Sequence, residues 1–260
     1  MIPLDFVCAG VNLQALPSGA LYWPPQHLLA VADLHLEKGS SYAVNALKLL
    51  PRHDTRQTLA VLSNLIDRLR PAIVVCLGDS FHDRDAVARL PEAERAEIGR
   101  LTTCARFVWI AGNHDPAPPP AGWGDVAEEL TLGPLTFRHE AQFGPAKGEV
   151  SGHFHPVAAL TVRGRGMRRR CFLTDGHRLI LPAFGAYAGG LTKFEPGDLL
   201  RLKLPDPFIG PQQFEDPFPA FVARHLALPA SDRLPELPGQ RLGKVSGQIV
   251  FDRSVWLLAV

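Results

Sequence analysis

The sequence predicts an α/β fold in which buried strands alternate with amphipathic helices. Three short apolar runs, at 28–32, 73–77 and 107–111, each end at a glycine or a polar residue, as buried strands with polar carboxyl ends do. A stretch of apolar residues at helical spacing separates the first run from the second. Such alternation is typical of βαβ units, whose functional residues gather beyond the carboxyl ends of the strands.

Composition excludes several other classes of protein. The chain has 260 residues, of which 46% are hydrophobic and 20% charged, so it is neither disordered nor a small disulfide scaffold. The formal net charge is +1, so any phosphate-binding surface must be local. We see no secretory signal and no run approaching ~18 apolar residues. Four scattered cysteines form no CxxC pair, and Cys76 and Cys104, beside apolar stretches, are expected to be buried thiols. These features predict a soluble, cytoplasmic protein.

Two helices are expected between the three strands. The first covers 54–69, with Asp54 or Thr55 as its amino-terminal cap. The second runs from 92 to about 100, with Pro91 suited to its first turn.

The carboxyl-terminal part has a different pattern. Residues 171–174 and 178–181 flank an Asp-Gly-His turn and predict a hairpin. The stretch 201–240 holds eight prolines, which disfavours a continuous helix or a central strand. Residues 248–260 are apolar enough to dock as a terminal strand. We expect a domain over residues 1–200 and a proline-rich extension over 201–260.

A series of polar residues follows the predicted strand ends. Imidazole, carboxylate and amide oxygen ligands together suit Mn²⁺, Fe²⁺ or Zn²⁺. One ion would leave several of these groups unused, whereas two ions would use them all. The series consists of Asp33, His35, Asp79, Asn113, His114, Asp115, His139, His153 and His155.

The spacing within two of these motifs has a structural interpretation. In an extended segment, residues two apart point to the same side, so 33–35 and 153–155 would each direct two ligands to one metal cluster. Leu34 and Phe154, which lie between the ligands, would then point into the interior. The glycines before Asp79, Asn113 and His153 are expected to allow a sharp turn at the strand end.

In this order over residues 33–155, the motifs resemble those of the calcineurin-like metallophosphoesterases, and the resemblance extends over roughly residues 20–195. It implies a four-layer αββα sandwich of two mixed β-sheets flanked by helices. It also implies two divalent ions, Mn²⁺ in the first place and Fe or Zn as alternatives. The implied ligands are Asp33, His35 and His155 for one ion, Asn113, His139 and His153 for the other, and Asp79 as the bridge.

Three further residues are assigned roles beside the metals. The resemblance implies that His114 faces the scissile phosphate. Asp115 is expected to orient His114, its alternative being a cap on the following turn. His82 is expected to hydrogen-bond a ligand or contact substrate, its alternative being an exposed loop histidine.

Three segments resemble one bacterial subfamily more closely, the ligase-associated DNA-damage-response phosphoesterases. They are 32–39, 77–83 and 181–191. This resemblance implies DNA as substrate, endonuclease activity, and association with an ATP-dependent DNA ligase, a helicase and an exonuclease. The sequence departs from the subfamily after about residue 200.

A basic run that ends at Arg178 lies close to these motifs, and Asp175 is the only local acid. It would either grip a nucleic-acid backbone or form a solvated hairpin tip. Tyr187 and Phe184 could stack on a base, although a core role suits Phe184 better. The run consists of Arg163, Arg165, Arg168, Arg169, Arg170 and Arg178.

Three functions therefore stay open. The first is a DNA-directed phosphodiesterase or nuclease in repair, and the second is a small-molecule phosphodiesterase or phosphomonoesterase with the same centre. The third is a non-catalytic binding module, which the complete ligand set and the intact His114 disfavour. The subfamily resemblance and the basic run favour DNA.

Overall fold

The structure is a computed structural model. It describes residues 3–44, 53–114, 119–142, 146–162, 165–188 and 256–259, with the backbone alone for 158–162, 165–169 and 256–259. The eight-proline stretch 201–240, Asp115 and Arg163 therefore lie outside the described residues.

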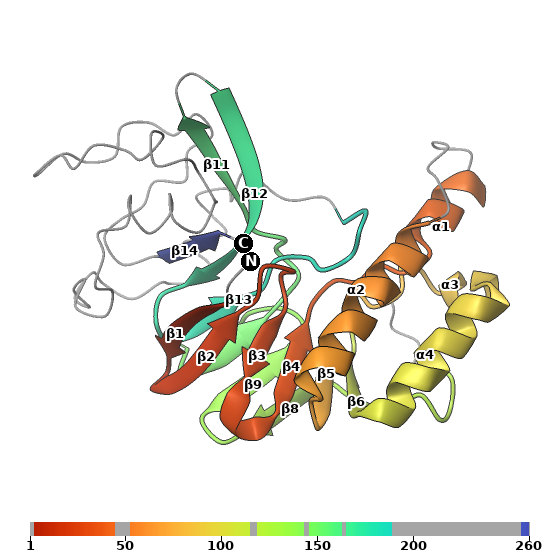
Figure 1. Cartoon of the computed structure of the whole chain (residues 1–260), viewed down its shortest axis with the longest axis horizontal. Coiled ribbons are helices and arrows are strands. Elements are labelled where there is room, and N and C mark those ends of the chain that lie inside the picture. Colours follow the sequence, from red (N-terminus) through yellow and green to blue (C-terminus); the bar gives the residue numbers. More distant parts are fainter. Residues whose placement is uncertain are drawn as a thin grey trace, which may run out of the picture.

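The first sheet has seven strands in sequential order, of which the last four are parallel and the rest antiparallel (Figure 1). Three of its central strands, β4, β5 and β6, are the three predicted apolar runs. The strands are β1 (Leu4–Cys8), β2 (Val11–Ala15), β3 (Leu21–Trp23), β4 (Leu28–Val31), β5 (Ile73–Leu77), β6 (Arg106–Ile110) and β7 (Asp125–Ala127).

The second sheet has the order β11-β12-β13-β10-β9-β8, and β14 pairs antiparallel with β12. Strands β9, β10 and β13 are parallel, and the other pairs are antiparallel, so this sheet too is mixed. The predicted hairpin around 175–177 is confirmed as the turn between β12 and β13. The strands are β8 (Glu129–Leu132), β9 (Leu135–Arg138), β10 (Glu149–Ser151), β11 (Val157–Val162), β12 (Arg165–Thr174), β13 (Arg178–Ile180) and β14 (Trp256–Ala259).

Both predicted helices are present, as α2 (Asp54–Leu69) and α4 (Glu92–Cys104), beside the shorter α1 (Lys38–Val44) and α3 (Ala86–Arg89) and a 3-10 turn, η1 (Pro24–Gln26). The predicted cap of α2 is wrong, because His53 precedes the helix without a capping side chain. Asp54 instead accepts a hydrogen bond from the Gly39 N–H, and Thr55 accepts one from the Glu37 N–H. These side chains brace the start of α1.

Two hydrophobic cores lie on the two faces of the first sheet. Leu28 and Ala30 of β4 belong to the core between the two sheets, whereas Leu29 and Val31 belong to the core under the helices. This alternation follows from the strand period of two. The predicted pair of mixed sheets with flanking helices is confirmed. The α-helices that the structure describes lie on the first sheet, on the side away from the second (Figure 1).

Cysteine burial was predicted in part. Cys8, Cys76 and Cys171 are buried, but Cys104 is exposed because α4 continues to Cys104 on its solvent side. Within the described part of the chain, no helix has the length and apolar character needed to cross a membrane.

Candidate metal centre

Polar residues from both sheets meet at one edge of the molecule. Asp33, Asp79 and Asn113 follow β4, β5 and β6 of the first sheet, while His139 and His153 follow β9 and β10 of the second. Backbone hydrogen bonds join these strand ends: the Asp33 N–H donates to the Gly78 carbonyl at 3.3 Å, and the Gly152 N–H donates to the His139 carbonyl at 2.9 Å. The strand ends therefore hold the side chains in fixed relation to one another.

The first donor group consists of Asp33, His35 and His155, whose ligand atoms all lie within 4.8 Å of one another. The Nε2 atoms of His35 and His155 are 3.3 Å apart, and His155 Nε2 lies 3.3 Å from Asp33 Oδ1. Asp33 is fully buried and His35 is 5% exposed. This is the set predicted for one ion.

The second donor group consists of Asp79, Asn113, His139 and His153. From His139 Nε2, the distances are 2.7 Å to Asn113 Oδ1, 3.2 Å to His153 Nδ1 and 3.5 Å to Asp79 Oδ1. This is the set predicted for the other ion, with the predicted bridging residue Asp79 among it. Asp33 also accepts the His153 N–H, which places the two groups side by side.

The hydrogen bonding of His139 shows that the second donor group fits a cation. Its Nδ1 lies 2.9 Å from the Leu77 carbonyl oxygen, which can only accept, so Nδ1 carries the proton. In the neutral ring, Nε2 then presents a lone pair, and that lone pair faces the oxygens of Asn113 and Asp79. Acceptors that converge in this way require a positive charge between them, and a second hydrogen bond of this kind is usual for metal-binding histidines.

Burial favours the neutral, lone-pair form of two imidazoles at this site, those of His35 and His82. Desolvation, followed by the nearby His155 and Lys38, lowers the pKa of His35 to about 2. Desolvation and then Lys38 also lower the pKa of His82. Neutral imidazole is the form that binds metal ions.

The backbone at the ligands differs from the predicted extended segments. Asp33, His35, Asp79, His153 and His155 have φ values of 52°, 44°, 47°, 69° and 45°, in the left-handed region that non-glycine residues seldom adopt. Each such residue costs about 1–3 kcal/mol, and such costs concentrate at functional sites. The paired ligands converge because the chain turns at each of them, and alternation along a strand is not the cause.

The predictions for the glycines and for the residues between the ligands are confirmed only in part. Gly78 does have a positive φ, of 74°, and a Cβ there would overlap the His139 ring. Gly152 shows no positive φ, and its lack of a side chain instead allows close approach, since a Cβ would lie 2.6 Å from Asp33 Oδ2. Leu34 is buried as predicted. Phe154 is only half-buried, with its ring 5.1 Å from that of His153.

His82 and His114 lie together beside the first donor group. Their rings stack at 5.6 Å, and the His35 ring lies 5.6 Å from His82 and 5.2 Å from His114. The His114 N–H donates to Asp79 Oδ1 at 2.9 Å, and His114 Nδ1 donates to the His82 carbonyl at 3.2 Å. His114 is exposed, so its ring is open to a substrate.

The basic run is divided by the fold. Arg165, Arg168 and Arg169 lie on β12, which pairs with β11. Arg170 donates to the carbonyls of Phe184 and Gly185 at 3.1 and 2.6 Å, which holds the loop after β13. Arg170, in this part of the run, therefore has a structural role.

The structure shows the burial of three further residues that the sequence associates with this run. Arg178 is buried and forms an ion pair with Glu149, so the expectation that it belongs to an open basic surface is wrong. Phe184 is buried in the core under the helices, whereas Tyr187 is half-buried. This agrees with the expected core role of Phe184.

Arg89 makes a set of contacts that the sequence did not indicate and that support the loops around the site. Arg89 donates to both carboxylate oxygens of Asp83, at 2.8 and 2.7 Å, and to Ser40 Oγ at 3.1 Å. It thereby ties α3 to α1 and to the loop that carries His82. No spacing along the chain could have indicated this contact, because Arg89 and Ser40 are 49 residues apart.

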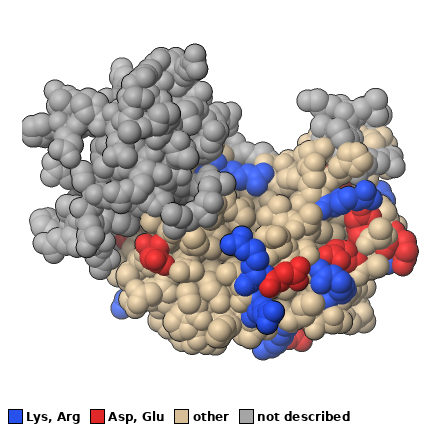
Figure 2. All heavy atoms as spheres, in the orientation of Figure 1, with Lys and Arg blue, Asp and Glu red and all other residues tan. Residues whose placement is uncertain are grey.

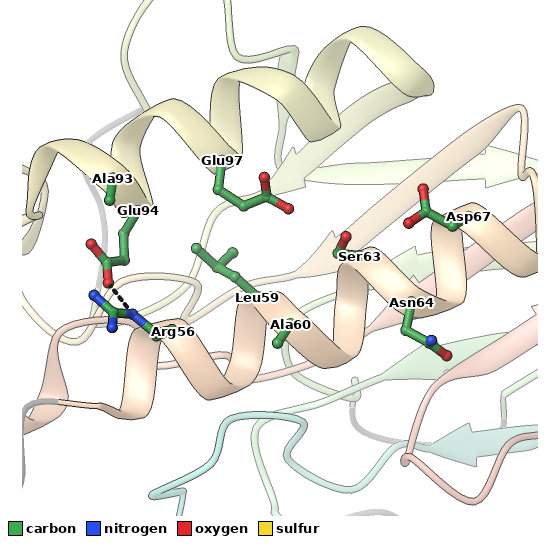
Figure 3. A pocket seen from close by; sticks show the side chains of 9 residues that line it. All are labelled: Arg56, Leu59, Ala60, Ser63, Asn64, Asp67, Ala93, Glu94 and Glu97. Atoms are coloured by element: carbon green, nitrogen blue, oxygen red, sulfur yellow. Dashed lines mark hydrogen bonds and ion pairs between the residues drawn. The ribbon is translucent and has the colours of Figure 1, made fainter.

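A second polar region is a groove of about 450 Å³ between α2 and α4 (Figure 3). There Arg56 pairs with Glu94 at 3.0 Å, and Arg100 pairs with Glu97 at 2.8 Å. Asp67, Asn64 and Ser63 complete its polar lining. Each glutamate already has an arginine, so the groove differs from the metal centre.

The comparisons with known proteins agree with this geometry. The family model described as calcineurin-like phosphoesterase matches residues 27–207. The chain is also similar to a solved structure titled the crystal structure of Pseudomonas putida nuclease MPE, with 33% sequence identity and a TM-score of 0.61. That match covers 75% of this chain and 92% of the other. No curated protein matches the sequence.

Proposed function

The chain belongs to the calcineurin-like phosphoesterase family, and from this premise we propose that it is a two-metal nuclease that hydrolyses phosphodiester bonds in DNA. The observation that carries the proposal is the convergence of two donor groups, from both sheets, next to the exposed His114. Manganese as the metal, a cytoplasmic location and a role in DNA repair are parts of the same proposal.

The residues of each donor group would hold one ion. When bound, the two ions would activate the phosphoryl oxygens and the attacking water as Lewis acids. His139 contributes a fixed tautomer, because its Nδ1 donates to Leu77 and leaves Nε2 toward the ion. Asp79 would join the groups through its carboxylate, whose Oδ1 is oriented by the His114 N–H.

His114 would act on the substrate directly. Because its Nδ1 donates to the His82 carbonyl, its Nε2 is the atom left to face a phosphate. When protonated, Nε2 donates a hydrogen bond to the developing charge or a proton to the leaving oxygen. His82, stacked on His114, would hold that ring in place, and Asp115 stays a predicted orienting residue.

DNA is supported by the similarity to a nuclease and by the basic run on β12. On the face seen in Figure 2, the described lysines and arginines are interspersed with acids. The formal net charge is only +1, so we propose a local group of phosphate contacts that consists of Arg163, Arg165, Arg168 and Arg169. Association with a DNA ligase, a helicase and an exonuclease stays a prediction.

The test is an activity screen after the protein has been stripped of metal. Mn²⁺, Fe²⁺ or Zn²⁺ is added back, and hydrolysis of bis-p-nitrophenyl phosphate is measured beside cleavage of single- and double-stranded DNA. We expect both the small diester and DNA to be hydrolysed. Activity on the small diester alone would favour a small-molecule phosphoesterase. Metal binding without hydrolysis would favour a binding module.

A further inference from the structure

Helix α1 lies beside the first donor group and has two contrasting faces. Gly39, Ser40 and Ser41 are buried. Lys38 and Tyr42, four residues apart, share a different face and are half-buried. The helix begins three residues after His35, and the Lys38 N–H donates to the His35 carbonyl at 3.3 Å. Its half-buried face therefore begins at the metal centre.

The buried face of α1 is fully used in holding the helix. The Gly39 N–H donates to Asp54 Oδ2 at 2.9 Å, and Ser40 Oγ donates to the Glu37 carbonyl at 2.9 Å while it accepts from Arg89. Contacts from α2 and α3 thus fix the helix. A recognition side chain gains specificity when its backbone is held in this way.

Tyr42 extends a series of rings that starts at the site. Its ring lies 5.9 Å from that of His82, tilted by 37°. His82 in turn lies 5.6 Å from both His35 and His114. The tyrosine ring is therefore separated by one ring from the predicted ligand His35 and from His114, which would face the scissile phosphate.

Lys38 brings a positive charge close to the same histidines. Its ammonium group acts electrostatically on both His35 and His82. Among the residues that the structure describes, no carboxylate forms an ion pair with it. The buried Asp54, which already accepts the Gly39 N–H, acts on it electrostatically. A half-buried cation of this kind is suited to an anionic partner from outside the chain.

We propose that Lys38 and Tyr42 form a nucleotide-binding face, in which the ammonium contacts a backbone phosphate and the ring stacks on an adjacent base. The inference rests on the proposed nuclease function and names the substrate more closely. Stacking on a side chain requires a base that has left its own stack. The preferred substrate is thus a single strand or a frayed end, with a base next to the scissile phosphate.

The test compares two end-labelled oligonucleotides of equal length, one with normal bases and one with abasic sugars throughout. The ratio of kcat/KM for the two strands is measured for the wild type, Tyr42→Ala, Tyr42→Phe and Lys38→Gln. Val44→Ala, at the exposed end of the same helix, is the matched control. Hydrolysis of bis-p-nitrophenyl phosphate together with cleavage of DNA by the wild type establishes the proposed function beforehand.

We expect Tyr42→Ala to lower the base-to-abasic ratio roughly 5- to 100-fold, mainly through KM, because one stacked base contributes about that much. Tyr42→Phe keeps the ring and should keep the ratio, as should Val44→Ala. Lys38→Gln should lower kcat/KM equally for both strands. It should also reduce the slope of log affinity against log salt concentration by about 0.7.

Three outcomes would overturn the inference. An equal loss of kcat/KM on both strands in Tyr42→Ala would mean that the ring has a structural role. An unchanged base-to-abasic ratio in an active Tyr42→Ala would mean that the base does not stack on this ring. A wild type that is inactive on the small diester and on DNA would remove the proposed function and this inference together.

Discussion

The metal centre and the α2–α4 groove are both rich in acids, but their charges are arranged differently. In the groove, Glu94 and Glu97 each have an arginine partner. At the metal centre, the lone pair of His139 faces the oxygens of Asn113 and Asp79. The glutamates of the groove thus already have cationic partners, whereas the converging acceptors of the metal centre would be balanced by bound cations. Acidic residues alone therefore do not indicate a site, and the missing counter-charge does.

The largest effect is expected from replacing a ligand. Asp79→Asn should weaken metal binding by at least about 10²-fold, since even the loss of a hydrogen-bond partner of a ligand costs 10–100-fold, and phosphodiesterase activity should fall with it. Bound metal is measured by elemental analysis after dialysis against limiting Mn²⁺.

Glu97→Gln in the groove is the matched control, because it also removes one negative charge. It should keep full metal content and change stability by no more than about 0.5 kcal/mol. Equal metal loss in both variants would mean that general charge, and not the donor geometry, holds the ions.

A smaller and more selective effect is expected at His114. His114→Ala should lower kcat by about 10²-fold, the usual contribution of an acid–base group. Metal content should stay at the wild-type level, because the contact from this residue to Asp79 comes from its backbone N–H. Loss of metal in this variant would show that the ring itself is a ligand.

The smallest effect separates backbone strain from site geometry. Gly78→Ala and Gly122→Ala both place a side chain at positive φ, of 74° and 92°, but only at Gly78 would the Cβ meet another group, the His139 ring. Both should lose about 1–2 kcal/mol of stability in denaturant titrations, and Gly78→Ala should lose more. Only Gly78→Ala should also weaken metal binding, and equal metal affinity in the two would contradict the packing argument.

The strand ends that carry the ligands were predictable because local signals define them. Each of the three central strands is a short apolar run, and the polar residue that follows is a predicted ligand. The left-handed backbone at Asp33 and His35 was not predictable, since the same spacing fits an extended segment. It depends on backbone partners in another loop, including the Gly78 and Asp79 carbonyls.

Arg178 illustrates why the surroundings of the site were harder to predict. In sequence it continues a basic run. In the fold, parallel pairing of β10 with β13 places it opposite Glu149, and the two form a buried ion pair. Only the strand order decides this contact, and nothing near Arg178 in the sequence indicates that order.

The donors of each group come from segments far apart in the chain, and this has a thermodynamic consequence. The second donor group joins Asp79 of the first sheet to His139 and His153 of the second. The Phe184 N–H donates to the Ala32 carbonyl where the same two sheets meet. A cation bound there would be a ligand of the folded state alone. Each tenfold rise in free metal above its dissociation constant would therefore add about 1.4 kcal/mol to the free energy of unfolding for each ion bound. Because the donors come from both sheets, binding would couple the melting temperature of the protein to the metal supply of its surroundings.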